Sequence, residues 1–300
     1  MKGASVAMDT STPPIGCHAL VWTGTFDQHG IVDAVRRTRR AGFDLVEFPL
    51  MEPRSFDSAT ARQALEDEGL AVTSSLGLPP QADISSDDPS VVAAGRELLT
   101  TALEATATMG GTHLVGVLYG AMAKHSAPLT AQGRDHSLSA LRLLADRAKQ
   151  LGITLGLEVV NRYETNLLNT GRQALRFIED LDRECTVHLD TYHMNIEEVD
   201  LFSPFLDCAD RLGYVHIGES HRGYLGTGSV DFESCFKALG RIGYDGPIVF
   251  ESFSSAVVSP SLSNTLGIWR NLWQDSDHLA AHANRFIRGH LDAVATTALH

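Results

Sequence analysis

The sequence predicts a single (β/α)8 barrel, and two observations support this fold class. Along the chain, an amphipathic stretch repeatedly ends in glycine and is followed by a short apolar run. A glycine after a helix adopts the left-handed conformation at no steric cost, and the chain can then enter a strand. The runs are apolar on both faces, which is typical of buried parallel strands. Eight such runs in 300 residues indicate an α/β barrel, which reaches this length as one domain.

The first predicted strand begins at Ile15, and the others follow at intervals that leave room for helices. The predicted strands cover residues 15–21, 43–47, 70–72, 112–115, 153–158, 186–189, 214–217 and 248–250. Helical patterns are clearest over residues 96–109, 137–151 and 171–181. A long loop is expected over residues 122–135, and an extended excursion over residues 260–277 precedes a C-terminal helix. We therefore expect a flexible tail over residues 1–14 and one barrel domain over residues 15–300.

A doubly wound open sheet is the alternative α/β fold. It is disfavoured because no glycine-rich phosphate loop follows the first predicted strand.

The composition argues against several classes of partner. The chain has 24 Lys and Arg against 37 Asp and Glu, a formal net charge of −13, whereas nucleic-acid-binding proteins display a basic face. A negative charge also disfavours docking on anionic lipid, and no apolar run approaches the ~20 residues that span a bilayer. Residues 1–14 do not resemble a secretory signal, and the four cysteines show no CxxC spacing. We therefore expect a cytoplasmic protein with reduced thiols and neither a nucleic-acid nor a membrane partner.

Ionisable side chains occur at the ends of the last four predicted strands. Glu158 ends the fifth strand, Asp190 ends the sixth, His216 lies in the seventh and Glu251 ends the eighth. In an α/β barrel the active site forms at the carboxyl ends of the strands. Inward-facing carboxylates at one rim repel each other, and a bound cation relieves that repulsion. We therefore predict a metal site with these four residues as ligands.

Three carboxylates and one imidazole form a mostly oxygen ligand set. Such a set favours octahedral Mn²⁺, Mg²⁺ or Co²⁺ over a tetrahedral, thiolate-rich Zn²⁺ site. Four protein ligands leave about two positions of an octahedron open. This suits a substrate that chelates through adjacent oxygens, such as a hydroxy-ketone. The metal would polarise the carbonyl and ease removal of a proton from the neighbouring carbon.

Further polar residues follow the same strand ends. Asn161 and Glu164 follow the fifth strand, His193 follows the sixth and Arg222 follows the seventh. Because they lie above the predicted metal site, each is a candidate for contact with the substrate.

Two other polar residues have structural interpretations. His188 lies two residues before Asp190 and therefore faces the same side of its strand. We expect it to be a hydrogen-bonded histidine in the barrel interior. Glu47 ends the second strand, and a structural role is expected for it.

Several stretches carry a resemblance to a known family. They are LEVVNRYE at 157–164, HLDTYHMNIEE at 188–198, VHIGE at 215–219, IGYDG at 242–246, FESF at 250–253 and GIWR at 267–270. Their order along the chain makes them more specific than one short motif. The chain resembles the ketose 3-epimerases of the D-tagatose and D-allulose (D-psicose) type, within the xylose-isomerase-like barrels. IGCHALVWTG at 15–24 and FDLVEFPL at 43–50 resemble the bacterial D-allulose 3-epimerases.

The resemblance implies a role for each matching residue. Glu158, Asp190, His216 and Glu251 match the ligands of one divalent metal per subunit. Glu158 and Glu251 also match the two acid/base carboxylates. The residues that match contacts to the ketose oxygens near C1 to C3 are Glu164, His193 and Arg222. Those that match the rest of the sugar pocket are His18, Phe26, Ser75, Leu118 and Phe253.

The chain departs from the D-tagatose 3-epimerase pattern at the distal part of the pocket. That pattern has an aromatic residue where His18 lies, a Trp near Phe26 and a Cys at Ser75. Its Trp after the fourth strand has no counterpart in residues 119–123. The resemblance therefore covers the residues around the reacting carbons better than the residues that select the ketose.

We therefore expect reversible C3 epimerisation of a free ketohexose, with D-fructose and D-allulose as the leading pair. One glutamate would remove the C3 proton to give a cis-enediolate, and the other would return a proton to the opposite face. The family implies a homodimer or homotetramer. An aldose–ketose isomerase on the same barrel is the alternative. The charge of −13 opposes a metal nuclease, and the complete ligand set opposes a sugar-binding barrel without catalysis.

Overall fold

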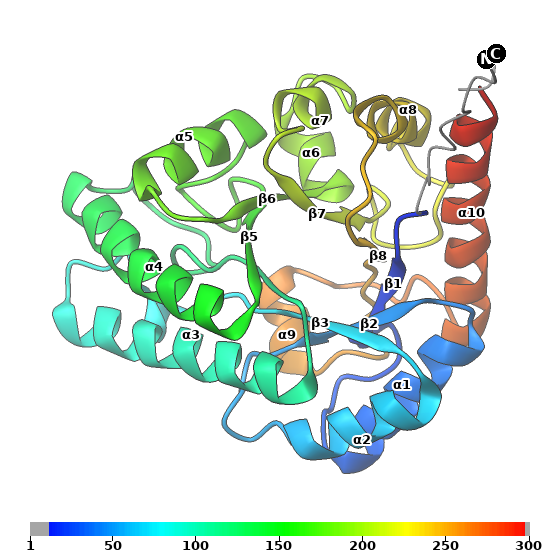
Figure 1. Ribbon diagram of the computed structural model, residues 1–300, viewed down its shortest axis with the longest axis horizontal. Helices are drawn as coiled ribbons and strands as arrows, with labels where there is room; N and C mark the ends of the chain where they lie inside the picture. The colour runs from blue at the N-terminus through cyan, green and yellow to red at the C-terminus, as the bar shows by residue number, and fades with distance from the viewer. Residues whose placement is uncertain (1–11, 298–300) are drawn as a thin grey trace, which may run out of the picture.

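Eight parallel strands form a closed barrel in the computed structural model, which describes residues 12–297 (Figure 1). Each strand pairs with the next one in the sequence, and β8 pairs with β1. The strands are β1 (Ile15–His18), β2 (Leu45–Pro49), β3 (Ala71–Ser75), β4 (His113–Gly116), β5 (Thr154–Val159), β6 (Thr186–Asp190), β7 (Leu212–Ile217) and β8 (Ile248–Phe250). The predicted (β/α)8 barrel is confirmed, since an open sheet would lack the pairing of β8 with β1.

Helices surround the strands. They are α1 (Gln28–Arg40), α2 (Ser58–Glu68), α3 (Pro89–Met109), α4 (Ala131–Leu151), α5 (Gly171–Leu181), α6 (Thr191–Glu197), α7 (Ser203–Asp207), α8 (Phe232–Ile242), α9 (Pro260–Leu266) and α10 (Ser276–Thr297). Figure 1 shows α3 and α4 side by side at one edge of the molecule and α10 at the other. Because α10 packs against α8, β1 and β8, the last helix covers the place where the barrel closes.

Several boundaries differ from the predicted ones. β1 ends at His18 because the next residues form the 3₁₀ helix η1 (Ala19–Val21), where the Leu20 N–H donates to His18 Nδ1. α3 and α4 begin earlier than their apolar patterns indicate, since the side chains of Asp88 and Thr130 cap their first turns. The loop after β4 therefore covers residues 117–130 in place of 122–135, and the expected excursion contains α9. Residues 1–11 of the predicted tail lie outside the described residues.

The glycine signal is confirmed at five helix ends and is wrong at one position; Gly42, which follows the Ala41 C-cap of α1, has a φ of 83°. The C-caps of α2, α3, α4 and α8 have φ values of 62°, 81°, 70° and 64°, and they are Gly69, Gly110, Gly152 and Gly243. Gly213 instead lies inside β7, where a Cβ atom would come within 2.4 Å of the Thr186 side chain. This glycine therefore allows β6 and β7 to approach each other.

The barrel interior has an apolar layer beneath a polar one. The buried apolar cluster inside the barrel comprises Leu45, Val115, Tyr214 and Val249. Side chains two positions further along a strand face the same side. In β2 and β7 these next residues are Glu47 and His216, both buried. The polar layer therefore lies toward the carboxyl ends of the strands.

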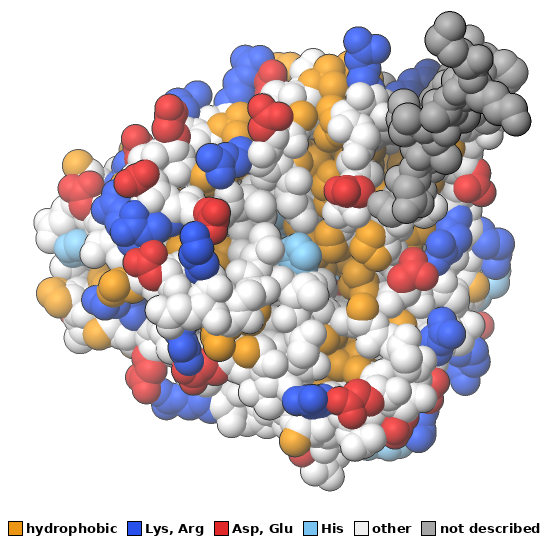
Figure 2. Space-filling view, viewed as in Figure 1, with side chains coloured by type: hydrophobic (Ala, Val, Ile, Leu, Met, Phe, Trp, Pro, Cys, Tyr) orange, Lys and Arg blue, Asp and Glu red, His pale blue; other side chains and the backbone are white. Residues whose placement is uncertain are grey.

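Opposite charges are interspersed over the face of the molecule that Figure 2 shows. Some ion pairs connect distant elements, such as Arg37 in α1 with Asp277 in α10 and Arg288 in α10 with Asp44. Exposed pairs of this kind contribute about 0–1 kcal/mol each, so they add little to stability. Within residues 12–297, no helix has the length and apolar character needed to cross a membrane.

Two helical glycines give a test of the helix packing. A Cβ atom on Gly95 of α3 would lie 2.2 Å from the carbonyl oxygen of Ala82, whereas a Cβ on Gly289 of α10 would meet nothing within 4 Å. Alanine is favoured over glycine in a helix by about 1 kcal/mol, so Gly289→Ala should raise the free energy of unfolding by up to that amount. Gly95→Ala should lower it by about 1–3 kcal/mol, because the new methyl group is overpacked against backbone. Denaturant unfolding measures both, and stabilisation by Gly95→Ala would contradict the described packing.

Candidate active site

The four predicted ligand side chains come from the carboxyl ends of four adjacent strands. Glu158 lies in β5, Asp190 ends β6, His216 lies in β7, and Glu251 directly follows β8. The strand register sets Asp190 opposite His216. All four residues are between 0% and 8% exposed. Parallel pairing therefore brings four metal-competent side chains together at one buried rim.

The possible ligand atoms converge on a small volume. His216 Nδ1 lies 3.5 Å from Glu251 Oε1 and 3.7 Å from Glu158 Oε1. One ligand atom each from Asp190, His216 and Glu251 lie within 4.8 Å of one another, and the same holds for Glu158, Asp190 and His193. His216 Nδ1 is buried and has no hydrogen-bond partner among the described residues. An imidazole nitrogen that has no hydrogen bond and faces carboxylate oxygens fits a divalent cation at this place.

Burying the carboxylates together changes their acidity. Burial raises the pKa of Glu158 to about 8; His216 opposes this rise, whereas the Glu251 and Asp190 carboxylates add to it. Burial alone would lower the pKa of His216, but Glu47 and Glu251 raise it well above its ordinary value. The cluster therefore favours positive charge, which a proton or a metal ion can supply.

Arg222 adds a permanent positive charge to this cluster. One guanidinium nitrogen lies 3.1 Å from Asp190 Oδ2 and also donates to the Glu251 carboxylate. The guanidinium lies 3.8 Å from the centre of the Tyr192 ring. Arg222 has a φ of 61°, a region that side chains disfavour, and its N–H donates to the Glu219 carbonyl oxygen. The loop after β7 therefore holds a strained conformation that directs this side chain into the cavity.

His193, on α6, has a hydrogen-bond donor beside each ring nitrogen, and Arg222 Nη2 lies 3.3 Å from its Nε2. The His193 Nδ1 atom accepts the Asn161 backbone N–H at 3.1 Å and lies 2.8 Å from Asn161 Nδ2. The Asn161 amide also donates to Glu164 Oε1 at 2.9 Å. Burial lowers the pKa of His193 to about 3 and raises that of Glu164. The two donors at Nδ1 favour the neutral ring that carries its proton on Nε2, so His193 can offer a donor beside the acceptor Glu164 in the same cavity.

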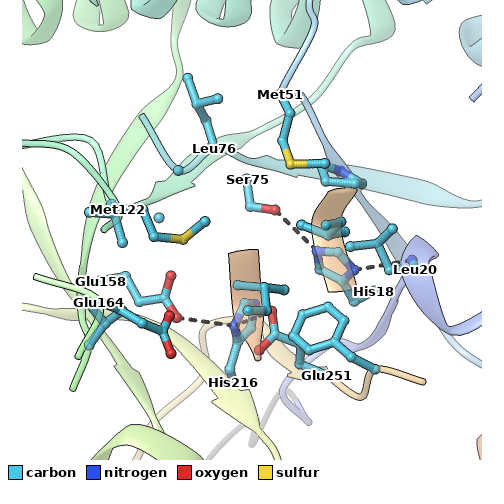
Figure 3. Close-up of a pocket in the computed structure, with 18 of the residues that line it drawn as sticks. His18, Leu20, Met51, Ser75, Leu76, Met122, Glu158, Glu164, His216 and Glu251 are labelled. Carbon is cyan, nitrogen blue, oxygen red and sulfur yellow. Dashed lines mark hydrogen bonds and ion pairs between the residues drawn. The ribbon is translucent and has the colours of Figure 1, made fainter. Parts of the chain in front are cut away.

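The far wall of the cavity is mostly apolar (Figure 3). Two polar groups on this wall are His18 Nε2 and Ser75 Oγ, which lie 3.3 Å apart. The larger apolar side chains that line the cavity are Leu20, Met51, Leu76, Met122, Phe253, Leu262 and Leu266. The cavity thus has a charged end beside the strand ends and an apolar end opposite it.

Most of the predicted site residues line this cavity. They are His18, Ser75, Glu158, Glu164, His193, His216, Arg222, Glu251 and Phe253. Asp190 is fully buried behind them, in contact with Arg222. Phe26 and Leu118 do not line the cavity. Phe26 packs edge-on against Phe48 at 6.0 Å, and Leu118 is buried in the core between strands and helices.

Some features of the cavity were not predicted. Leu262 and Leu266 lie one turn apart on α9 and reach the cavity from outside the barrel strands. Their i, i+4 spacing indicates that they share one face of a helix, but it does not indicate which part of the protein that face packs against. His188 is in the interior as expected, but neither ring nitrogen has a hydrogen-bond partner among the residues described. The expected hydrogen bond is therefore wrong, since the ring packs against Tyr214 and His216 instead.

The chain is similar to known proteins over nearly its whole length. The sequence model of the xylose isomerase-like TIM barrel family matches residues 35–287. A ketose 3-epimerase of Arthrobacter globiformis is 63% identical over 287 residues, which cover 95% of this chain and 99% of the relative. An L-ribulose 3-epimerase of Methylomonas sp. (strain DH-1) is 50% identical, with coverage of 91% and 96%.

A solved structure agrees with these sequence matches. The crystal structure of a D-allulose 3-epimerase from Methylomonas sp. in complex with D-allulose has a TM-score of 0.91 at 49% identity, and covers 93% of this chain and 98% of that one. The resemblance indicated by the sequence motifs is confirmed. The chain belongs to the xylose isomerase-like TIM barrel family and, within it, to the ketose 3-epimerases, enzymes that act on sugars.

Proposed function

We propose that this enzyme catalyses reversible C3 epimerisation of free ketohexoses, with D-fructose and D-allulose as the leading pair, and uses one divalent metal per subunit. The observation that carries this proposal is the pair Glu158 and Glu251. Their carboxylates lie 3.7 Å and 3.5 Å from the same atom, His216 Nδ1, in one cavity. Inversion at carbon by proton transfer needs a base on one face and an acid on the other. Two carboxylates that reach one cavity from β5 and β8 can supply both.

Glu158, Asp190, His216 and Glu251 would hold the metal, which we expect to be Mn²⁺, Mg²⁺ or Co²⁺. The mostly oxygen donor set and the buried His216 Nδ1, which has no hydrogen-bond partner among the described residues, support this assignment. When bound, the cation supplies Lewis acidity to the ketose carbonyl, which makes the hydrogen on the adjacent carbon more acidic.

The two glutamates would move the proton. One takes the proton from C3, which leaves an enediolate of the sugar, and the other delivers a proton to the opposite face. In the reverse reaction their roles exchange.

Three further side chains would hold the sugar near C1 to C3. Arg222 offers fixed donors to an oxygen that becomes negative in the enediolate. His193 offers its Nε2–H, and Glu164 offers an acceptor beside it. Around the remaining carbons, we propose contacts with His18, Ser75 and Phe253, which line the same cavity.

The relatives differ in the sugar that their names carry. They include enzymes named for L-ribulose and D-psicose, besides the structure that holds D-allulose. The preferred ketose, the native metal and the expected homodimer or homotetramer therefore stay predictions. Identifying the products formed from a panel of unphosphorylated ketoses would determine the preferred ketose.

Asp190→Asn should weaken metal binding and turnover together. In the wild type, Asp190 Oδ1 accepts the Tyr192 N–H at 2.7 Å. The amide of Asn keeps the shape of the side chain and can still accept this N–H, but it lacks the negative charge that attracts the cation. Since even outer partners of metal ligands are worth about 10- to 100-fold in affinity, we expect the Kd for Mn²⁺ to rise at least about tenfold. Calorimetry on chelator-treated protein measures this. Asp200→Asn is a matched control, because exposed Asp200 also accepts N–H groups at a helix start. Wild-type affinity in Asp190→Asn would remove Asp190 from the ligand set.

Arg222→Ala should reduce sugar turnover far more than metal content. A guanidinium does not ligate a divalent cation, but the loss of one preorganised donor to a developing oxyanion typically costs about 10²- to 10³-fold in rate. We expect kcat/KM for D-fructose and D-allulose to fall by that order, with the bound Mn²⁺ per subunit unchanged. Arg172→Ala, at an exposed arginine paired with Asp207, serves as the control. Unchanged kinetics in Arg222→Ala would show that this side chain does not contact the sugar.

Solvent labelling separates epimerisation from the isomerase alternative. If two glutamates act on opposite faces of C3, one glutamate removes the C3 proton and the other delivers a different proton. The product formed in D₂O should then carry deuterium at C3 and none at C1. A hydride shift between C1 and C2 would move hydrogen within the substrate and leave C3 unlabelled. NMR of the product measures this, and protium retained at an inverted C3 would exclude the two-glutamate mechanism.

A further inference from the structure

Glu47 is a buried carboxylate beneath the proposed metal site, and its partners are unusual. It is fully buried in β2, and its Oε2 accepts a hydrogen bond from His216 Nε2 at 2.8 Å and one from the Tyr214 hydroxyl at 2.7 Å. His18 Nε2 lies 3.4 Å from Oε1. No lysine or arginine within residues 12–297 forms an ion pair with it. A buried carboxylate is costly unless polar partners stabilise its charge. Oε2 has two such partners, whereas Oε1 has no hydrogen bond among the described residues.

The hydrogen bonds of Glu47 indicate which His216 nitrogen carries a proton. Glu47 Oε2 accepts from the Tyr214 hydroxyl at 2.7 Å and lies 2.8 Å from His216 Nε2. A carboxylate is only an acceptor, so the His216 nitrogen that faces it is the donor. In a ring that binds a cation, the other nitrogen then supplies the lone pair.

The two nitrogens of His216 thus have different environments. Nε2 donates to Glu47, whereas Nδ1 has no hydrogen-bond partner and faces Glu158 and Glu251. A carboxylate behind a metal-binding histidine fixes the tautomer and ring orientation and increases the basicity of the ligand nitrogen.

We infer that Glu47 is a positioning residue, whose carboxylate holds His216 as the Nε2–H tautomer with its Nδ1 lone pair directed at the divalent cation. This inference rests on the proposed role of His216 as a ligand. It gives Glu47 a task in metal binding, beyond the structural role that its sequence position indicates.

Glu47 is itself held from a third strand. The hydroxyl groups of Tyr214 and Thr73 lie 2.6 Å apart, so Thr73 can donate to the Tyr214 oxygen while Tyr214 donates to Glu47. The chain of hydrogen bonds runs from β3 through β7 to β2 and back to His216 in β7. It orients the imidazole from below, on the side away from the cavity.

The test is the affinity of chelator-treated Glu47→Gln for Mn²⁺. Gln keeps the size of the side chain but removes the charge and can present an N–H to His216. We expect the Kd to rise by about 10- to 100-fold, with an unfolding temperature of the metal-free protein near that of the wild type. Glu219→Gln is the matched control, since Glu219 is also fully buried but accepts only backbone N–H groups of its own loop. A Kd within twofold of the wild type in folded Glu47→Gln would overturn the inference.

Two further measurements keep the result interpretable. Nitrogen-15 NMR of histidine-labelled wild-type protein with Mg²⁺ reports the tautomer directly, even if Glu47→Gln does not fold. A protonated Nε2 in His216 supports the inference, and a protonated Nδ1 overturns it. His216→Asn separates the two proposals. If this variant binds Mn²⁺ normally, the proposed ligand set is wrong. If it binds weakly while Glu47→Gln binds normally, only the role of Glu47 is wrong.

Discussion

The arrangement of this active site depends on how the negative charge of several buried carboxylates at one end of the barrel is compensated. Glu47, Glu158, Asp190 and Glu251 are each at most 8% exposed. Each buried anion costs several kcal/mol unless a partner stabilises its charge. Arg222, which a strained loop brings in, supplies positive charge to this volume. Further positive charge comes either from a proton on His216 in the metal-free protein or from the proposed divalent cation.

The barrel separates the parts that stabilise the fold from those that carry chemistry. Its lower interior is filled by a small apolar cluster that includes Leu45 and Val249, and a larger core lies between strands and helices. The polar side chains begin two residues later along the strands, at Glu47 and His216. Because strands pair on both sides, these side chains are held by the backbone of the whole barrel. A site that needs its ligand atoms within a few ångströms of one another benefits from that rigidity.

The cavity is charged at one end and apolar at the other. In the proposed reaction, the carbon that exchanges a proton, C3, lies at the charged end, where Glu158, Glu251 and Arg222 converge. The rest of the sugar would lie against Met51, Met122 and the two leucines of α9, with His18 and Ser75 as polar groups. Because α9 and its flanking segment supply part of this wall, the end that contacts the distal carbons is built partly outside the barrel strands.

The sequence by itself determined the barrel and the four metal-competent side chains, because both follow from local order. Strand periodicity and glycine caps such as Gly110 are short-range signals, and the carboxyl ends of successive parallel strands must meet at one rim. The roles proposed for Glu164, His193 and Arg222 came from the family resemblance, and all three side chains line the cavity.

Tertiary structure alone decided which side chains face each other across the barrel. Glu47 and His216 are 169 residues apart in the sequence and meet only because β1 pairs with β8 and closes the sheet. The same closure leaves His188 with ring contacts in place of a hydrogen bond. Phe26 and Leu118 do not line the cavity: Phe26 packs against Phe48 and against the cluster that contains Leu20 and Phe253, and Leu118 is buried in the main core. Their contact with the sugar stays a prediction. Local pattern sets which residues reach the rim, whereas barrel closure and loop packing set which of their atoms come into contact.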